Sequence, residues 1–318
     1  MRSRLILILA ITIALAAVAA ASARLIGSSL SSRPPAHASL PSELAAYLGV
    51  FETGVPPDYA TIADFTQAAG RQPNLLGYYS GWAGTFDTSF ADMLHEHKII
   101  PFVQIDPTDA SIAAIAAGTY DAWLRTYADS IADFGHAVVI GFGHEMNATW
   151  YTWGYHHVPP STFVAAWRHM VTVFRGEGAG NVTWLWTLQA DQSGTGPIAS
   201  WWPGAQYVTW VGIDGYYMRP SDTFASVFGP TIDQVRAFTG KPILLSETAV
   251  GPAAGQFVKI QNLFQGMATY KTLGLVWFDK AQHGSIEHQD WRIEDNQLAQ
   301  LSFKLAVLRE LAPNPPTG

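Results

Sequence analysis

The sequence predicts an α/β protein built as a single (β/α)8 TIM barrel. The chain has 318 residues, which suits one large barrel domain. Eight short apolar runs alternate with longer segments of helical periodicity. The runs are continuously apolar, as in strands that a parallel sheet buries on both faces. An open doubly wound sheet is the alternative, but residues 51–57 do not form the glycine-rich phosphate turn that usually follows its first strand.

The eight expected strands are apolar runs of β-type composition, separated by segments long enough for a helix. In chain order they are Tyr47–Phe51, Leu75–Tyr79, Ile99–Gln104, Val138–Phe142, Val182–Trp186, Val211–Tyr216, Pro242–Leu245 and Leu275–Phe278.

The segments between the strands carry helical signals. In one of them apolar side chains recur every three or four positions, at Phe163, Ala166, Trp167, Met170, Val171 and Phe174. Asp, Ser or Thr often precedes such a segment, as a helix N-cap does. Gly70, Gly135 and Gly240 follow three of them and are expected to end helices.

The N-terminus has the pattern of a targeting segment. Arg2 and Arg4 precede an apolar run from Leu5 to Ala21, and Ala21-Ser22-Ala23 fits a signal-peptidase site. We expect residues 1–23 to be a signal peptide or an N-terminal membrane anchor, because a run of 17 residues, apolar apart from Thr12, is long for the first and short for the second. Either one predicts a secreted or extracellular protein, membrane-anchored in the second case.

The remainder divides into three parts. We expect residues 24–39 to form a linker rich in Ser, Ala and Pro, residues 40–312 to form one folded domain, and residues 313–318 to form a Pro-rich tail. Neither an internal repeat nor a second linker is present, and we expect a monomer.

Composition excludes several functional classes. Apolar residues make up 48% of the chain and charged residues only 14%, with a net charge of −7. Only 18 residues are Lys or Arg and none forms a basic run, which argues against a nucleic-acid partner. The absence of cysteine excludes disulfides, thiolate metal sites and a cysteine nucleophile.

Two glutamates follow predicted strands that lie across the barrel mouth from each other. Glu145 follows the fourth strand in the segment GFGHEMN, and Glu247 follows the seventh in LLSET, 102 positions later. The carboxyl ends of barrel strands form the active-site face, so both side chains can converge there. Paired carboxylates are what cleavage of a glycosidic bond requires. The polar residues at strand ends are Glu145, Tyr216, Glu247 and Asp279.

Other chemistries find little support. The His144-Glu145 pair resembles the start of a zinc-protease motif, but Ala148 occupies the place of the second histidine. His156 and His157 lie in a polar loop with no carboxylate beside them. A Gly-x-Ser-x-Gly elbow and a phosphate loop are absent. We therefore expect neither a metal site nor a cofactor.

The tryptophans divide by their expected position. Trp184 and Trp186 lie within a strand, and Trp123 and Trp167 lie on helices, so these four are expected to pack in the core. Exposed aromatic rings at strand ends often mark binding sites. The candidate platforms for sugar rings are Trp150, Trp153, Trp201, Trp202 and Trp277.

With these motifs the chain resembles glycoside hydrolase family 26, a family of retaining (β/α)8 glycosidases. The resemblance spans residues 45 to 310 and is most specific in the segment HEMNATWYTWG at 144–154. It extends to the segments at 211–216, 245–248, 277–280 and 290–292.

The resemblance implies a role for each candidate site residue. Glu145 matches the acid/base and Glu247 the nucleophile, whose carboxyl groups should lie about 5–5.5 Å apart in a retaining enzyme. The residues implied in binding the substrate or supporting the site are His144, Trp150, Trp153, Tyr216 and Trp277.

The implied substrate is a β-linked polysaccharide or oligosaccharide, foremost β-1,4-mannan. A β-1,3-1,4-glucanase or a xylanase of the same family is the alternative, and a catalytically silent carbohydrate-binding barrel is the alternative from another class. Three departures from the family pattern fall near the glycone subsites and bear on the choice of sugar. They are Gly141–Gly143 in place of Arg-Pro, Ala148 in place of Gly, and Gln104–Pro107 without a Trp.

Overall fold

A computed structural model gives the fold of most of the chain. It describes residues 39–52, 59–191, 194–251, 255–281, 290–313 and 316. By compactness the chain divides into Met1–Ala36 and His37–Gly318. The expected signal peptide or anchor and nearly all of the expected linker lie outside the described residues, as does most of the tail. Among the residues described, no helix has the length and apolar character needed to cross a membrane.

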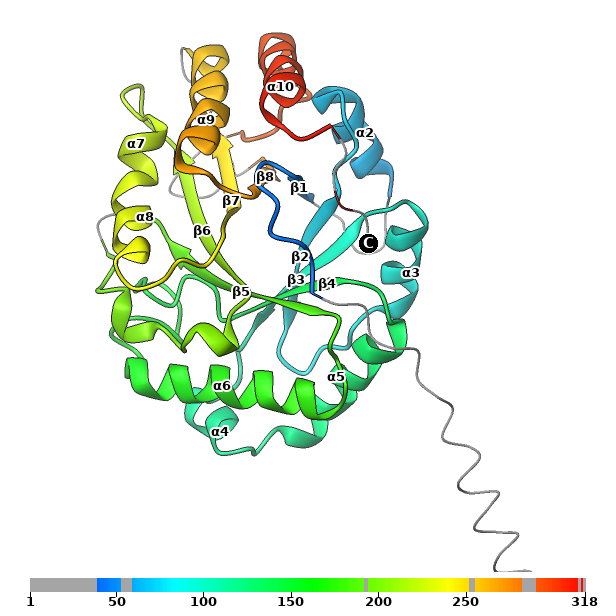
Figure 1. The fold of residues 1–318 in the computed structure, drawn as a ribbon, viewed down its shortest axis with the longest axis vertical. Coiled ribbons are helices and arrows are strands. Elements are labelled where there is room, and N and C mark those ends of the chain that lie inside the picture. Colours follow the sequence, from blue (N-terminus) through cyan, green and yellow to red (C-terminus); the bar gives the residue numbers. More distant parts are fainter. Residues whose placement is uncertain are drawn as a thin grey trace, which may run out of the picture. The chain divides into compact units, whose positions relative to one another are not determined.

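Eight parallel strands close into a barrel in sequence order, with β8 pairing back onto β1 (Figure 1). The predicted (β/α)8 barrel is confirmed, and each predicted apolar run forms a strand. The strands are β1 Tyr47–Glu52, β2 Leu75–Gly81, β3 Ile100–Asp106, β4 Val138–Phe142, β5 Val182–Gln189, β6 Trp210–Tyr217, β7 Ile243–Val250 and β8 Gly274–Asp279.

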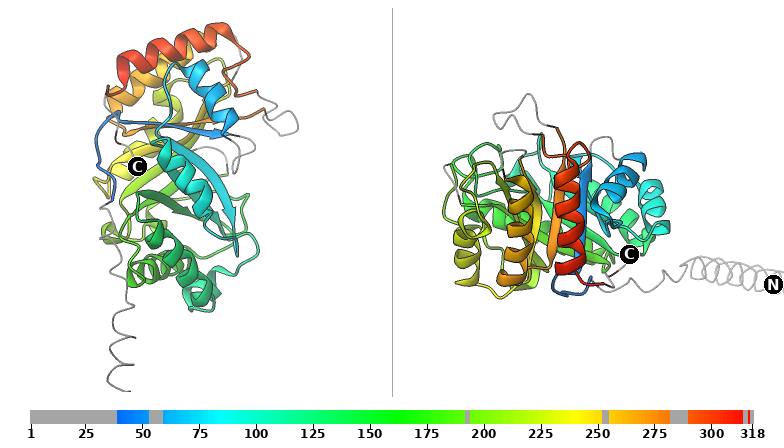
Figure 2. Two further views of the ribbon diagram at one scale, coloured as in Figure 1. Left: turned by 90° about the vertical axis from the view of Figure 1, so that its right-hand side faces the viewer. Right: turned by 90° about the horizontal axis from the view of Figure 1, so that it is seen from above.

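Helices surround the strands on the outside (Figures 1 and 2). The α-helices are α2 Ala60–Ala69, α3 Thr88–Glu96, α4 Ile112–Ala116, α5 Asp121–Phe134, α6 Pro160–Gly176, α7 Phe224–Val227, α8 Gly229–Arg236, α9 Gln256–Tyr270 and α10 Gln297–Glu310. Two short 3-10 turns, Ala199–Trp201 and Ala205–Tyr207, lie between β5 and β6.

The core has two layers because successive strand residues face opposite sides of the sheet. One buried cluster fills the barrel interior and includes Phe102, Trp210, Leu244 and Val276. A larger cluster packs the outer faces of the strands against the helices. On α6 the six apolar residues of the predicted helical pattern are buried in this outer layer.

Two of the three predicted helix ends are confirmed. Gly70 and Gly135 adopt left-handed backbone, with φ of 73° each, at the C-caps of α2 and α5. The prediction for Gly240 was wrong, since α8 ends at Arg236 and Ala237 is its C-cap.

An extra residue in β7 sets the geometry of the barrel mouth. Gly212 of β6 pairs with Leu244, whereas Asp214 pairs with Glu247, so β7 carries one more residue than β6 between the two pairs. Such a bulge breaks the alternation of side chains. As a result, Ser246 and Glu247 both point inward, and Glu247 lies within the strand rather than after it as predicted.

Candidate active site

Glu145 lies in the loop that leaves β4 and adopts an unusual backbone. Its φ is 53°, in the left-handed region that a residue with a Cβ seldom occupies, and Gly143, two positions earlier, has a φ of 52°. Its N–H donates to the Thr187 carbonyl of β5 at 3.0 Å. Strained backbone of this kind persists where the surroundings over-determine it, and it concentrates at functional sites.

Asn147 fixes this loop to the neighbouring strand. Its side-chain amide donates to the Gln189 carbonyl at 2.8 Å, and its side-chain oxygen accepts from the Gln189 N–H at 2.9 Å. Asn147 is almost fully buried. These two bonds engage the backbone of β5 beyond the end of β4, as a paired strand would, and they hold in place the segment that carries Glu145.

The Glu145 carboxyl is buried and receives one specific donor. The indole N–H of Trp150 donates to its Oε2 at 2.7 Å. Burial raises the pKa of Glu145 to about 7, with the charge of Glu247 adding to the rise and the neighbouring His144 opposing it. A carboxyl group with such a pKa can hold a proton at neutral pH and give it to a leaving group.

Glu247 has a different environment, made of two hydroxyl donors. Tyr216 at the end of β6 donates to Oε2 at 2.6 Å, and Tyr79 at the end of β2 donates to Oε1. These hydrogen bonds fix the position of both oxygens of the carboxyl group. The expected contact between Tyr216 and the strand-seven glutamate is therefore present, and Tyr79 adds a partner that the sequence reasoning missed.

A third carboxyl group lies beneath Glu247. Asp214 of β6 is fully buried, and its Oδ1 accepts a hydrogen bond from the Ser246 hydroxyl at 2.6 Å. Burial, followed by the charges of Glu247 and Glu145, raises the pKa of Asp214 well above its usual range. Asp214 therefore holds its proton more tightly than an exposed aspartate does.

His144 is held between an acid and a phenol. Its Nδ1 lies 2.9 Å from Asp106 Oδ1, at the end of β3, and its Nε2 lies 3.0 Å from the Tyr151 hydroxyl. Burial opposes the charged form, but the hydrogen bond and charge of Asp106 outweigh it and raise the pKa of His144 to about 9. The protonated imidazole is thus the expected form near Glu145 at neutral pH.

Removing the Asp106 charge should make His144 easier to deprotonate. In Asp106→Asn we expect the His144 pKa to fall from about 9 towards the ordinary value of 6.5. Because the folded state holds this proton more tightly than the unfolded state, its contribution to stability is full below pH 6.5 and is lost as the pH rises through about 9. NMR titration of the His144 ring protons measures the change. An unchanged titration would exclude Asp106 as its cause.

The structure places Trp153 behind the site rather than on its surface. The indole is 3% exposed, donates to the His144 carbonyl at 2.9 Å and stacks on Tyr151 with ring centroids 4.4 Å apart. The prediction that Trp153 is an exposed sugar platform was wrong, because the loop after β4 folds back over it. Its contacts support His144 and Tyr151 instead.

Trp277 is also buried, contrary to the prediction of an exposed platform. It is 0% exposed, its N–H donates to the Trp291 carbonyl at 3.0 Å, and its ring packs edge-on against Phe303 of α10. The side chain points out of the barrel because it occupies an outward position of β8. The next residue, Phe278, points inward and contacts Phe51 and Tyr216.

This placement predicts a stability effect at Trp277. Trp277→Phe removes the bond to the Trp291 carbonyl and part of the packing on Phe303, so the free energy of unfolding should fall by about 1–3 kcal/mol. The KM for substrate should stay unchanged. Urea unfolding and steady-state kinetics test both parts, and a raised KM with intact stability would restore Trp277 as a platform.

Among the candidate platforms, Trp150 presents the most surface. Its side chain is 46% exposed while its N–H is bonded to Glu145, so a ring face remains free beside the acid. Trp201 is fully buried, which contradicts its prediction as a platform, and Trp202 packs against Trp186 and Phe238.

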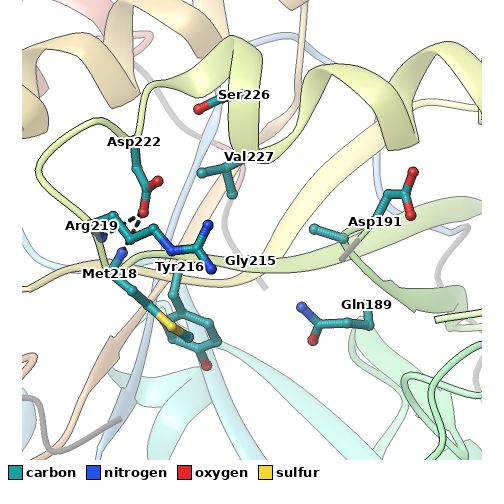
Figure 3. A pocket seen from close by; sticks show the side chains of 10 residues that line it. Gln189, Asp191, Gly215, Tyr216, Met218, Arg219, Asp222, Ser226 and Val227 are labelled. Atoms are coloured by element: carbon teal, nitrogen blue, oxygen red, sulfur yellow. Dashed lines mark hydrogen bonds between the residues drawn. The ribbon is translucent and has the colours of Figure 1, made fainter. Parts of the chain in front are cut away.

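A polar pocket adjoins Tyr216 (Figure 3). It has a volume of about 140 Å³ and lies between the end of β5, with Gln189, and the segment after β6. The Asp222 carboxylate accepts the N–H groups of Met218 and Arg219 at 2.8 and 2.7 Å and so shapes the pocket wall. The pocket offers polar contacts next to the residue that holds Glu247.

Sequence reasoning missed several contributors that share one signal. Tyr79, Asp106 and Phe278 each lie at or near the carboxyl end of a predicted strand and face the barrel interior. Their distance in sequence from both glutamates hid the connection. Attention to the last inward residue of every strand would have found them.

Comparison with known proteins supports the assignment of the fold. The solved structure of Bacillus subtilis mannanase BCman superposes with a TM-score of 0.63 over 90% of this chain and 97% of that one, at 19% identity. Endoglucanase H of Acetivibrio thermocellus is 27% identical over 271 residues, which are 80% of this chain and 29% of that protein.

A second curated relative is the mannan endo-1,4-beta-mannosidase A and B of Caldalkalibacillus mannanilyticus. It is 28% identical over 99 residues, 29% of this chain and 19% of that protein. The chain thus matches less than a third of the length of either curated relative.

The family model for glycosyl hydrolase family 26 matches residues 117–299, more than half of the chain. This range contains both Glu145 and Glu247. The chain belongs to glycosyl hydrolase family 26.

Proposed function

We propose that the protein is a retaining glycoside hydrolase that cleaves β-linked polysaccharide, foremost β-1,4-mannan. One observation carries the proposal: two buried glutamates at the barrel mouth have opposite environments. Glu145 accepts an indole N–H and has a raised pKa, whereas two phenolic hydroxyls hold Glu247. Separate environments for two carboxyl groups assign separate roles to them.

In the first step Glu247 attacks the anomeric carbon and Glu145 protonates the departing glycosidic oxygen. The C–O bond to the leaving group breaks as the ester bond to Glu247 forms, and the proton of Glu145 leaves with the alcohol. The hydroxyls of Tyr79 and Tyr216 orient the Glu247 carboxylate for this attack.

In the second step Glu145, now ionised, takes a proton from water. As this proton passes to Glu145, the water oxygen attacks the anomeric carbon and the ester bond to Glu247 breaks, so that Glu145 is protonated again and Glu247 leaves as a carboxylate. Two displacements at the same carbon keep the anomeric configuration of the substrate.

The sugar is proposed from what lies around the carboxyl pair. The free face of Trp150 suits a sugar ring next to the acid, and the pocket beside Tyr216 supplies polar groups for its hydroxyls. A relative named as an endo-mannosidase supports mannan, while the one named as an endoglucanase keeps β-glucan as the alternative.

A polysaccharide panel tests the proposal. Reducing-sugar release by the full-length protein is measured on β-mannan, galactomannan, barley β-glucan, lichenan and xylan, with Glu247→Ala as control. We expect release from mannan that the variant lacks. Release from the glucans or xylan alone would assign the specificity to that polymer instead of mannan. Binding without release from any polymer would indicate a catalytically silent carbohydrate-binding barrel.

We further propose that the domain acts outside the cytoplasm as a monomer. The support is the charged start and apolar run within residues 1–23, which fit export with or without cleavage. N-terminal sequencing of the protein recovered from the medium and from membranes distinguishes a signal peptide from an anchor. Light scattering of the purified protein gives its mass in solution.

A further inference from the structure

Three carboxyl groups meet where the first and last strands, β1 and β8, pair and close the barrel, a region that we call the β1–β8 seam. They lie on the outer side of these strands, away from Glu145 and Glu247. Glu52 ends β1 and Asp279 ends β8, and the two residues pair in register. Glu294, in the segment before α10, is the third. One oxygen from each residue lies within 4.8 Å of the others.

Two of these carboxyl groups are buried, and part of the cluster has no hydrogen-bond partner. Glu52 is 5% exposed and Asp279 is 2% exposed. Glu52 Oε1 and Glu294 Oε2 are both shielded from solvent and have no hydrogen-bond partner. Buried carboxylate oxygens are normally paired or bound to a metal ion, since leaving them without a partner is costly.

Among the described residues, no side-chain cation forms an ion pair with these three carboxyl groups, although the charge of Arg292 acts on Glu52. Arg292 is near, but its guanidinium is engaged by Asp290 and Asp295, at 2.7 and 2.8 Å. The described residues thus bring three carboxyl groups together at one point and place no ion-paired side-chain cation among them.

The donor set selects the class of ion. All three ligands are carboxylates, the oxygen donors that hard divalent cations prefer. The three oxygens lie within 4.8 Å of one another, close enough for one ion to bind all three, since calcium binds oxygens at about 2.3–2.6 Å. Magnesium usually keeps several waters and takes only one or two carboxylates, so three carboxylates, two of them buried, favour calcium.

We propose that Glu52, Asp279 and Glu294 bind a calcium ion that fastens the β1–β8 seam. The ion joins the ends of the first and last strands, where the barrel closes, to the segment that leads into α10. The adjacent inward residues Phe51 and Phe278 stack on each other beside Tyr216, so the site also steadies one wall of the candidate active site.

Thermal unfolding of the full-length protein tests the site without using any substrate. The protein is stripped with EDTA, dialysed and heated with CaCl2, with MgCl2 at equal concentration, or with neither. We expect calcium at about a hundredfold excess over Kd to raise the Tm by about 5 °C, and magnesium to raise it by less than half as much. The readout is independent of catalysis, so it stands or falls separately from the proposed hydrolysis.

Matched variants locate the effect. Glu52→Gln and Glu294→Gln each remove one ligand with little change of shape, and both should lose the calcium shift. Asp295→Asn removes the same charge one position away and should keep it, because Asp295 is 66% exposed and bonded to Arg292. An unchanged wild-type Tm in calcium, an equal shift with magnesium, or a full shift in both Gln variants would overturn the proposal.

Discussion

Replacing Glu247 by alanine should reduce kcat on the polysaccharide by about 10⁴-fold or more, because the variant lacks the carboxylate that forms the proposed covalent intermediate. The fold should survive, since within the described part of the chain the glutamate carboxyl accepts side-chain hydrogen bonds from Tyr79 and Tyr216 alone. Steady-state hydrolysis and the Tm of the variant measure the two effects. An unfolded variant would lose activity whatever the role of Glu247 in the reaction, so an unchanged Tm is the required control.

Rescue of Glu247→Ala by azide is a more specific test of the nucleophile role. In Glu247→Ala a small anion can enter the space that the carboxylate leaves and attack an activated aryl β-glycoside. We expect azide to restore turnover and to yield the α-glycosyl azide, since one displacement replaces two. A variant that keeps substantial activity on polysaccharide without azide would remove Glu247 from the nucleophile role.

Replacing Glu145 by glutamine should slow hydrolysis of the polysaccharide by about 10²–10⁴-fold, the usual contribution of a general acid. The first step with an aryl glycoside should suffer far less, because a good leaving group departs without a proton. Comparing the two substrates in one variant therefore isolates proton donation. Equal losses on both would place the defect elsewhere, for instance in the loop that Asn147 holds.

The pH profile of the wild type also reports on proton donation by Glu145. Glu145 must be protonated to act as the acid, so kcat/KM should fall as the pH rises through about 7. His144, with a pKa of about 9, keeps its charge across that range. In Glu145→Gln this alkaline limb should disappear. An unchanged limb would assign it to another group.

The sequence predicted the barrel, and the placement of Glu145 and Glu247 together at its mouth, because the signals for both are local. Continuous apolar runs identify strands buried on two faces, and the segment from Gly141 to Asn147 carries its polar residues at the end of such a run. Because the active sites of such barrels form at the carboxyl ends of the strands, this rule alone predicts that Glu145 and Glu247 lie at the same face of the barrel.

The aromatic positions could not be predicted in the same way. Whether a residue of β8 faces the mouth depends on register, and one position separates the buried Trp277 from the inward Phe278. The loop that buries Trp153 is irregular, so periodicity says nothing of its path. The bulge that turns both Ser246 and Glu247 inward likewise appears only once β7 is paired with β6.

The carboxyl cluster on the β1–β8 seam depends entirely on closure of the barrel. Glu52 and Asp279 are 227 positions apart in sequence, and they become neighbours only when the last strand pairs with the first. Asp279 stood out in the sequence as a polar strand end, but its partner Glu52 and the unpartnered oxygens did not.

The configuration of the first product tests the retaining mechanism most directly. Proton NMR of mannohexaose, or of the oligosaccharide of whichever polymer is cleaved, follows the anomeric signals in the first minutes of reaction. The account predicts that the β-anomer appears first and that mutarotation then forms the α-anomer. Initial release of the α-anomer would show inversion, and it would contradict the assignment of Glu247 as the nucleophile.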